Sequence, residues 1–278
     1  MKPLLSVWID LLKEASERRW ILAIAAGITL ILLTMACALQ LDVVDGALAA
    51  TRFFGKPIRT DIGAVDQTLR PLFEAVSDLL YYGSLTIGIF VSADFGPSLL
   101  EPGRIEQLLA LPLRRWELLA GTFLGVLTLV LVGNLYASLG VTAILGVKTG
   151  YWTVKPVASA LMATVAFISL YGVILATSLF VRSASISGTA GFLLFIAGIV
   201  ASFEKEVAGL FKPGIGRVFF EIICVPLPKI GSLGVFSQDL GYVSLPDWLQ
   251  VSRLLLGHVL FGGACLMIGL FHFERKDF

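Results

Sequence analysis

The stretch from Glu101 to Gly121, EPGRIEQLLALPLRRWELLAG, joins two runs of apolar residues that are each about as long as a membrane is thick. A connection that only reversed the chain direction would need about four residues. This one carries its own helical pattern, two prolines and a cluster of charges. We therefore expect it to be a structured element between two membrane spans.

The composition of the chain predicts an integral membrane protein. Of its 278 residues, 57% are hydrophobic and 15% are charged, and the mean hydropathy is +0.89, whereas a soluble domain has about 25% charged residues. The net charge of +1 gives no reason to expect a nucleic-acid partner. The three cysteines, Cys37, Cys224 and Cys265, are too scattered for a disulfide framework or a zinc site.

A spanning helix needs about 20 mostly apolar residues, and six segments of the chain meet this requirement. They cover residues 20–40, 72–92, 118–145, 157–181, 186–203 and 251–271. The first is interpreted as a retained span, because no convincing small-residue cleavage site follows it. We therefore predict an all-α membrane protein in which residues 1–278 form a single transmembrane domain.

An even number of spans places both termini on one side of the membrane. The numbers of Lys and Arg on the two sides nearly tie, with ten of the 21 on the side of the termini. Those ten are packed into shorter segments, which the positive-inside rule weighs most. Both termini, the segment 93–117 and the turn 182–185 are therefore predicted to be cytoplasmic.

The segments outside the spans have patterns of their own. Residues 1–19 carry apolar side chains at helical spacing and predict an interfacial helix, although a helix packed on the other spans would share the pattern. The segment 204–250 contains apolar pieces too short to span, which predict re-entrant or interfacial helices on the outer side. Gly121 and Gly125 predict a close helix contact, either within the chain or in a dimer.

The charged stretch predicts a short amphipathic helix over residues 101–112. Proline is tolerated in the first turn of a helix, which suits Pro102, and Pro112 ends the pattern. Ile105 and Leu109 fall on one side, and Glu106 falls on another. Such a helix offers an apolar face to its own bundle and a charged face to the cytosol, although a helix that lies on the lipid surface without a partner fits the same pattern.

The pattern E-x-G-x-I-E-x-L-L-x-L-P-x-x-R-W-E-L-L-x-G over 101–121 resembles the signature between the second and third spans of type-2 ABC transporter permeases, and the tail FHFERKDF is similar to their usual ending. The resemblance implies that this segment is a coupling helix that docks on a separate ATPase subunit. It implies coupling roles for Glu101, Gly103, Arg104, Ile105, Glu106, Leu109, Pro112, Arg115 and Trp116. It also implies a second, smaller contact through Arg182, Ser183 and Ser185.

The same resemblance implies an assembly of two permease copies, expected as a homodimer, with two ATPase subunits that bind ATP and Mg²⁺. The chain itself has no G-x-x-x-x-G-K-[ST], H-E-x-x-H or G-x-S-x-G motif, so we expect no cofactor and no enzyme activity in it. The central parts of the predicted spans also lack Asp, Glu, Lys and Arg, which ion-coupled carriers usually place at membrane depth. The energy for transport is therefore expected from the partner.

Three functional hypotheses remain open at this point. The first is the membrane subunit of an ATP-driven exporter or translocator in a cell membrane. The second is a secondary carrier or channel, and the third is a mechanotransmitter or anchor that acts on a periplasmic or surface partner. The sequence does not identify a substrate pathway; the polar residues available to face one are Asn134, Tyr136, Thr164, Tyr171 and His258.

Overall fold

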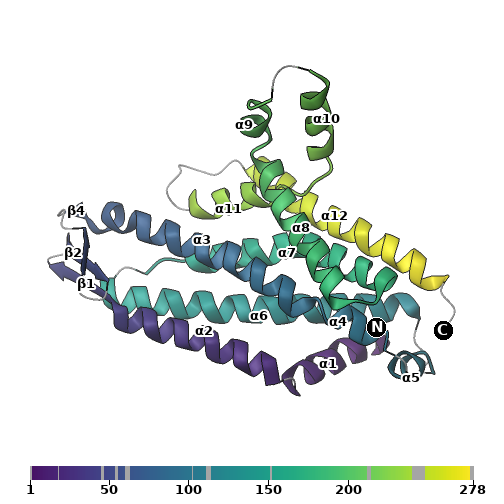
Figure 1. The fold of residues 1–278 in the computed structure, drawn as a ribbon. Coiled ribbons are helices and arrows are strands. Elements are labelled where there is room, and N and C mark those ends of the chain that lie inside the picture. Colours follow the sequence, from purple (N-terminus) through teal and green to yellow (C-terminus); the bar gives the residue numbers. More distant parts are fainter. Residues whose placement is uncertain are drawn as a thin grey trace.

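The computed structural model describes residues 2–17, 19–44, 47–53, 56–59, 63–101, 103–110, 114–150, 152–211, 214–239 and 248–275. Within these ranges the chain is a bundle of long helices, with a small sheet at one end and two short helices that project from the bundle (Figure 1). Five helices are long and apolar enough to cross a membrane. The predicted class, a helical multi-pass membrane protein, agrees with this architecture.

These five helices correspond to the second to sixth predicted spans. They are α3 (Val65–Ser92, followed by α4, Phe95–Leu99), α6 (Arg115–Thr149), α7 (Lys155–Val181), α8 (Ala184–Ser202) and α12 (Trp248–Glu274). Since α6 has 35 residues, it is about 52 Å long at about 1.5 Å per residue. It therefore extends beyond a hydrocarbon layer of about 30 Å, and the helix continues past the predicted span 118–145 at both ends.

The first predicted span corresponds to α2 (Arg19–Ala38), which follows α1 (Lys2–Glu17). The two helices meet at a bend of 67° and together count as at most one further span, so that the described chain has five or six.

α1 packs lengthwise on α6. Its buried residues Val7, Leu11 and Ala15 recur every four positions and form one face of the helix. Gly121 and Gly125 of α6 make room for them, since a Cβ atom on either glycine would lie 2.8 Å from Val7 or Leu11. The predicted close contact of these glycines is therefore a seam within the chain, and α1 is a helix packed on the bundle.

A small antiparallel sheet connects α2 to α3. Its strands are β1 (Leu39–Val44), β2 (Ala47–Phe53), β3 (Lys56–Arg59) and β4 (Gly63–Ala64), in the order β1-β2-β3 with β4 also paired to β2. We did not predict these strands. Asp45 and Gly46 form a dipeptide that is typical of hairpin turns and stands between two apolar runs, and this signal could have indicated the sheet.

α7 is the centre of the bundle and packs against α3, α6, α8 and α12. Its buried residues Phe167 and Tyr171 stack with their ring centroids 5.8 Å apart. The backbones of α7 and α12 also meet, because a Cβ atom on Gly172 would lie 2.6 Å from the carbonyl oxygen of Gly262. Small residues allow this close approach between helices in a membrane, where lipid provides no hydrophobic drive.

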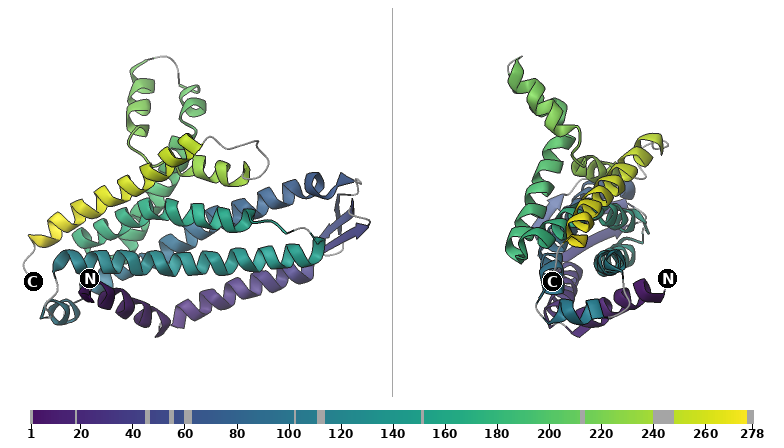
Figure 2. Two further views of the ribbon diagram at one scale, coloured as in Figure 1. Left: turned by 180° about the vertical axis from the view of Figure 1, so that it is seen from behind. Right: turned by 90° about the vertical axis from the view of Figure 1, so that its right-hand side faces the viewer.

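The two ends of the bundle carry different elements (Figure 2). The start of α1, the end of α12 and the short helix α5 (Arg104–Ala110) lie at one end, and the strands lie at the other. We call the first of these the α5 end and the second the sheet end.

The predicted outer segment 204–250 contains three short helices in its described part. α9 (Glu204–Ala208) and α10 (Ile215–Cys224) project from the bundle, whereas α11 (Ile230–Asp239) packs against α3, α7 and α8 (Figure 1). α10 and α11 have 10 residues each and α9 has five. None of them is long enough to span a membrane, as predicted for this segment.

Candidate functional site

The charged stretch between the second and third predicted spans contains α5, which is shorter than the predicted helix over 101–112. Gly103 precedes it with φ of +85°, a value that a helical residue does not adopt. The N–H groups of Arg104 and Ile105 donate to the carbonyl oxygen of Glu101 at 3.2 Å. Glu101 therefore stands outside the helix, and Pro112 lies outside the described residues.

The apolar side of α5 is buried in its own chain. Ile105 is only 3% exposed, and Leu108 packs beside it. The cluster around Ile105 contains residues from α1, α4, α6, α7 and α12, namely Val7, Leu99, Leu118, Leu119, Leu179 and Phe273. Ile105 lies on the face that the sequence pattern offers to the bundle, and it is buried against the bundle.

Arg104, to which the resemblance gives a coupling role, is bound to α1. Its Nη1 donates to Oε1 of Glu14 at 2.8 Å, and its Nη2 donates to Oε2 of the same carboxylate. Both side chains are less than one third exposed. The two residues are 90 positions apart, so no local pattern indicates the pair. Arg104 therefore links α5 to α1.

Arg115 joins the start of α6 to the end of α12. Its Nη1 donates to the carbonyl oxygens of Phe273 at 2.7 Å and Glu274 at 3.1 Å. The guanidinium carbon also lies 5.6 Å from the ring centroid of Phe273, within the range of a cation–π interaction. A cation at the last carbonyl groups of a helix stabilises its negative end. Arg115 is therefore a contact within the chain, not a free surface group.

The surface that α5 leaves to solvent is mainly acidic. Glu101, Gly103 and Glu106 are exposed, and a Cβ atom on Gly103 would meet no atom within 4 Å. Trp116, at the start of α6, is 42% exposed. The side chain of Leu109 lies outside the described part of the chain. Among the predicted coupling residues of 101–116 whose side chains the structure describes, Glu101, Gly103, Glu106 and Trp116 are the exposed ones.

The turn between α7 and α8 lies at the same end of the bundle as α5. Arg182 and Ser185 are exposed, and Arg182 has φ of 52°, which is uncommon for a residue with a side chain. Just before the turn, Leu179 belongs to the cluster around Ile105, and Phe180 stacks on His272 of α12 at 4.2 Å between ring centroids. The end of α7, just before this turn, therefore packs in the same cluster as Ile105 of α5.

The polar residues that were available for a substrate pathway are not gathered in one place. Asn134 donates to Thr164 Oγ1 at 3.0 Å, and the Tyr136 hydroxyl lies 2.8 Å from Thr29 Oγ1. The buried hydroxyl of Tyr171 has no partner among the described residues. His258 lines a separate pocket near the start of α12, which sequence reasoning did not predict.

No metal centre is found in the described part of the chain, where no three His, Cys, Asp or Glu residues lie close enough to share an ion. No family model matches the chain, and no curated protein matches it.

Proposed function

We propose that the chain is the membrane-spanning permease subunit of an ATP-driven transporter of the type-2 ABC kind. The observation that carries the proposal is α5, which presents Glu101 and Glu106 to solvent while its buried side is anchored to several bundle helices. A separate ATPase would dock on this surface, and two permease copies would pair with two ATPase subunits. The transported substrate is not identified by any feature of the site.

The proposed topology has six spans, with α2 as the first. An even number of spans keeps both termini on one side, and the start of α1 and the end of α12 do lie at the same end of the bundle. We place this end in the cytoplasm, because the segments there have the denser Lys and Arg.

The anchoring of α5 gives the proposal a mechanical basis. A displacement of α5 by an ATPase would reach α1 through the Arg104–Glu14 pair and would reach α6 and α12 through the cluster around Ile105. Packed helices transmit such shifts as rigid elements. A helix that only rested on the lipid surface would need none of these connections.

Charge reversal on the exposed surface of α5 tests the docking. Glu106→Arg should weaken copurification of the ATPase about tenfold or more, since it replaces an attractive charge with a repulsive one. Insertion and folding of the chain should not change, because Glu106 is exposed. The matched control is Glu17→Arg, another exposed acid, on α1. Normal ATPase binding and hydrolysis with Glu106→Arg would contradict the proposal.

A second candidate function is a mechanotransmitter that acts on an outer partner, which would contact α9 and α10. Both helices project from the bundle, and α10 exposes large apolar side chains, with Ile215 at 91%, Phe219 at 64% and Ile222 at 63%. Such a surface needs lipid or a partner to cover it.

We propose that lipid covers this surface, as interfacial helices on the outer side would require. Quenching by brominated lipids tests this in a variant whose native cysteines are replaced by serine. A fluorophore on Phe219→Cys should be quenched strongly, and one on Glu221→Cys, on the other face of α10, should be quenched weakly. Equal weak quenching at both positions would favour a protein partner instead.

A further inference from the structure

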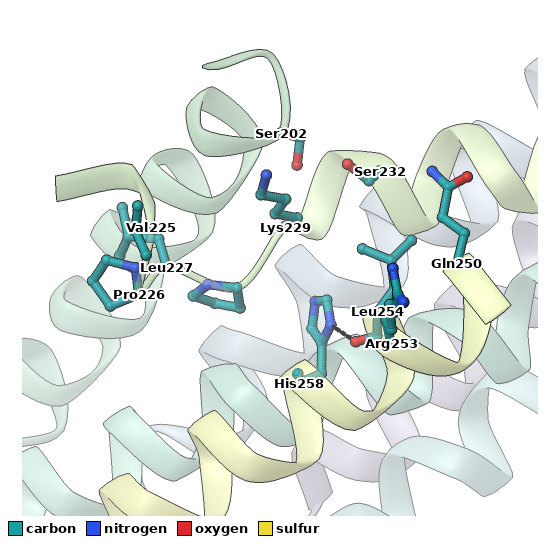
Figure 3. Close-up of a pocket in the computed structure, with 12 residues that line it drawn as sticks. Ser202, Val225, Pro226, Leu227, Lys229, Ser232, Gln250, Arg253, Leu254 and His258 are labelled. Carbon is teal, nitrogen blue, oxygen red and sulfur yellow. Dashed lines mark hydrogen bonds between the residues drawn. The ribbon is translucent and has the colours of Figure 1, made fainter. Parts of the chain in front are cut away.

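A pocket of about 430 Å³ lies where the end of α8, the start of α11 and the start of α12 meet (Figure 3). Its volume is within the range of small-molecule sites. One part of its wall is apolar and includes Val225, Leu227 and Leu254. The other part carries groups that can donate hydrogen bonds, from Ser202, Lys229, Ser232, Gln250, Arg253 and His258.

His258 has an unsatisfied nitrogen at this pocket. The residue is 1% exposed, and its Nδ1 lies 2.9 Å from the carbonyl oxygen of Leu254. Because a carbonyl oxygen only accepts, Nδ1 must be the donor of this bond. The other ring nitrogen, Nε2, has no partner among the described residues, and the ring points into the pocket (Figure 3). A buried polar atom without a partner is costly, so a ligand atom at this position would stabilise the site.

The charges around the pocket favour an anion. Lys229 and Arg253 both line it, and no ion pair of Arg253 occurs in the described ranges of the chain. Lys229 is 3.5 Å from Glu204, which is longer than the usual charge-assisted hydrogen bond of about 2.7–2.9 Å. Among the described residues, Glu204 is the one carboxylate in ion-pair contact with either cation, so that one positive charge remains for a ligand.

We propose that this pocket binds the phosphate group of an anionic ligand. A phosphate has several terminal oxygens, which match donors that converge from three helices, and the fork of Arg253 can hold two of these oxygens at once. The anion would also favour a proton on Nε2 of His258, and the ring would then donate a hydrogen bond to one of these oxygens. The apolar wall with Val225 and Leu227 suits a carbon chain attached to that group. A phospholipid headgroup and free phosphate share this chemistry.

The proposal does not depend on an ATPase, because binding to the pocket needs only the chain itself. The test uses the full chain purified in a maltoside detergent without phosphate buffer. One probe is inorganic phosphate, titrated by calorimetry. The other is phosphatidylglycerol, counted on the protein by native mass spectrometry against diacylglycerol with the same acyl chains, which lacks the phosphate.

Arg253→Gln should weaken binding about tenfold or more, since it removes a charge-assisted contact. His258→Phe keeps a ring of similar size and should weaken binding as well. The matched control is Arg217→Gln: Arg217 pairs with Glu221 on the exposed α10 and does not line the pocket. This variant should bind as the wild type does. Monodisperse elution of each variant shows that it has folded.

Binding of phosphatidylglycerol alone would support the proposal with a lipid headgroup as the source, and binding of inorganic phosphate would support it with the free anion as the source. The proposal is overturned if neither probe binds, if diacylglycerol binds as well as phosphatidylglycerol, or if Arg217→Gln loses as much affinity as Arg253→Gln. Wild-type affinity in both pocket variants would overturn it too.

Discussion

Two short helices outside the main bundle, α5 and α10, have opposite surroundings. The apolar side of α5 is buried, with Ile105 at 3% exposure, whereas Ile222 of α10 is 63% exposed. Arg104 of α5 pairs with a residue of another helix, but Arg217 of α10 pairs with Glu221 one turn further along the same helix. The apolar side of α5 is therefore covered by its own chain, whereas the apolar side of α10 requires lipid or a partner to cover it.

This difference bears on function. A helix that transmits force into a bundle needs rigid connections to it, and α5 has them through an ion pair and a buried cluster. α10 has few such connections, so its position can follow whatever covers its apolar face. Substitutions at matched positions of the two helices test this distinction directly.

The largest difference is expected for truncation of an apolar side chain. Ile105→Ala should lower the free energy of unfolding by about 2–5 kcal/mol, because it leaves a cavity in a packed cluster. Ile222→Ala removes the same atoms from an exposed position and should change the free energy of unfolding by about 0.5 kcal/mol or less. Both values are obtained from denaturant unfolding in detergent, followed by circular dichroism.

Equal losses in the two variants would contradict the comparison. A large loss with Ile222→Ala alone would mean that α10 folds back onto the bundle in solution. Ile105→Val serves as an internal check. It deletes a single carbon group and should lower the free energy of unfolding by about 0.5–1.5 kcal/mol.

The five long apolar helices were predictable because a run of about 20 apolar residues is a local signal that a bilayer requires. The helix α5 was predictable from another local signal, the helical spacing of its apolar residues. Its partners were not: Glu14 lies 90 residues from Arg104, and the sequence does not indicate that these two meet. The pocket combines Lys229 of the α10–α11 connection with Arg253 of α12, and only the packing of α11 brings these two residues together.

A smaller difference is expected for the two ion pairs. Arg104→Gln should cost about 1–3 kcal/mol, since it removes the two charge-assisted hydrogen bonds that Arg104 donates to the partly buried carboxylate of Glu14. Arg217→Gln breaks an exposed pair within one helix and should cost about 0.3–0.5 kcal/mol. Double-mutant cycles with Glu14→Gln and Glu221→Gln isolate the two coupling energies. A coupling energy near zero for Arg104 and Glu14 would show that the pair does not link α5 to α1.

The smallest effects are expected for two glycines, and they should have opposite signs. Gly103 has φ of +85° with no atom near its Cβ position, so Gly103→Ala adds only backbone strain and should destabilise the chain by about 1 kcal/mol. Gly216 lies in the first turn of α10, also with open space around it. Gly216→Ala should stabilise the chain by about 0.5 kcal/mol, because alanine favours the helix.

Thermal unfolding of both variants in the same detergent measures the two shifts. The sign of the shift in unfolding temperature is informative for α5 in particular. If Gly103→Ala stabilises the chain, residue 103 is helical in solution. The helix would then begin near Glu101, as the sequence pattern predicted, and the exposed acidic surface proposed for ATPase docking would have a different shape.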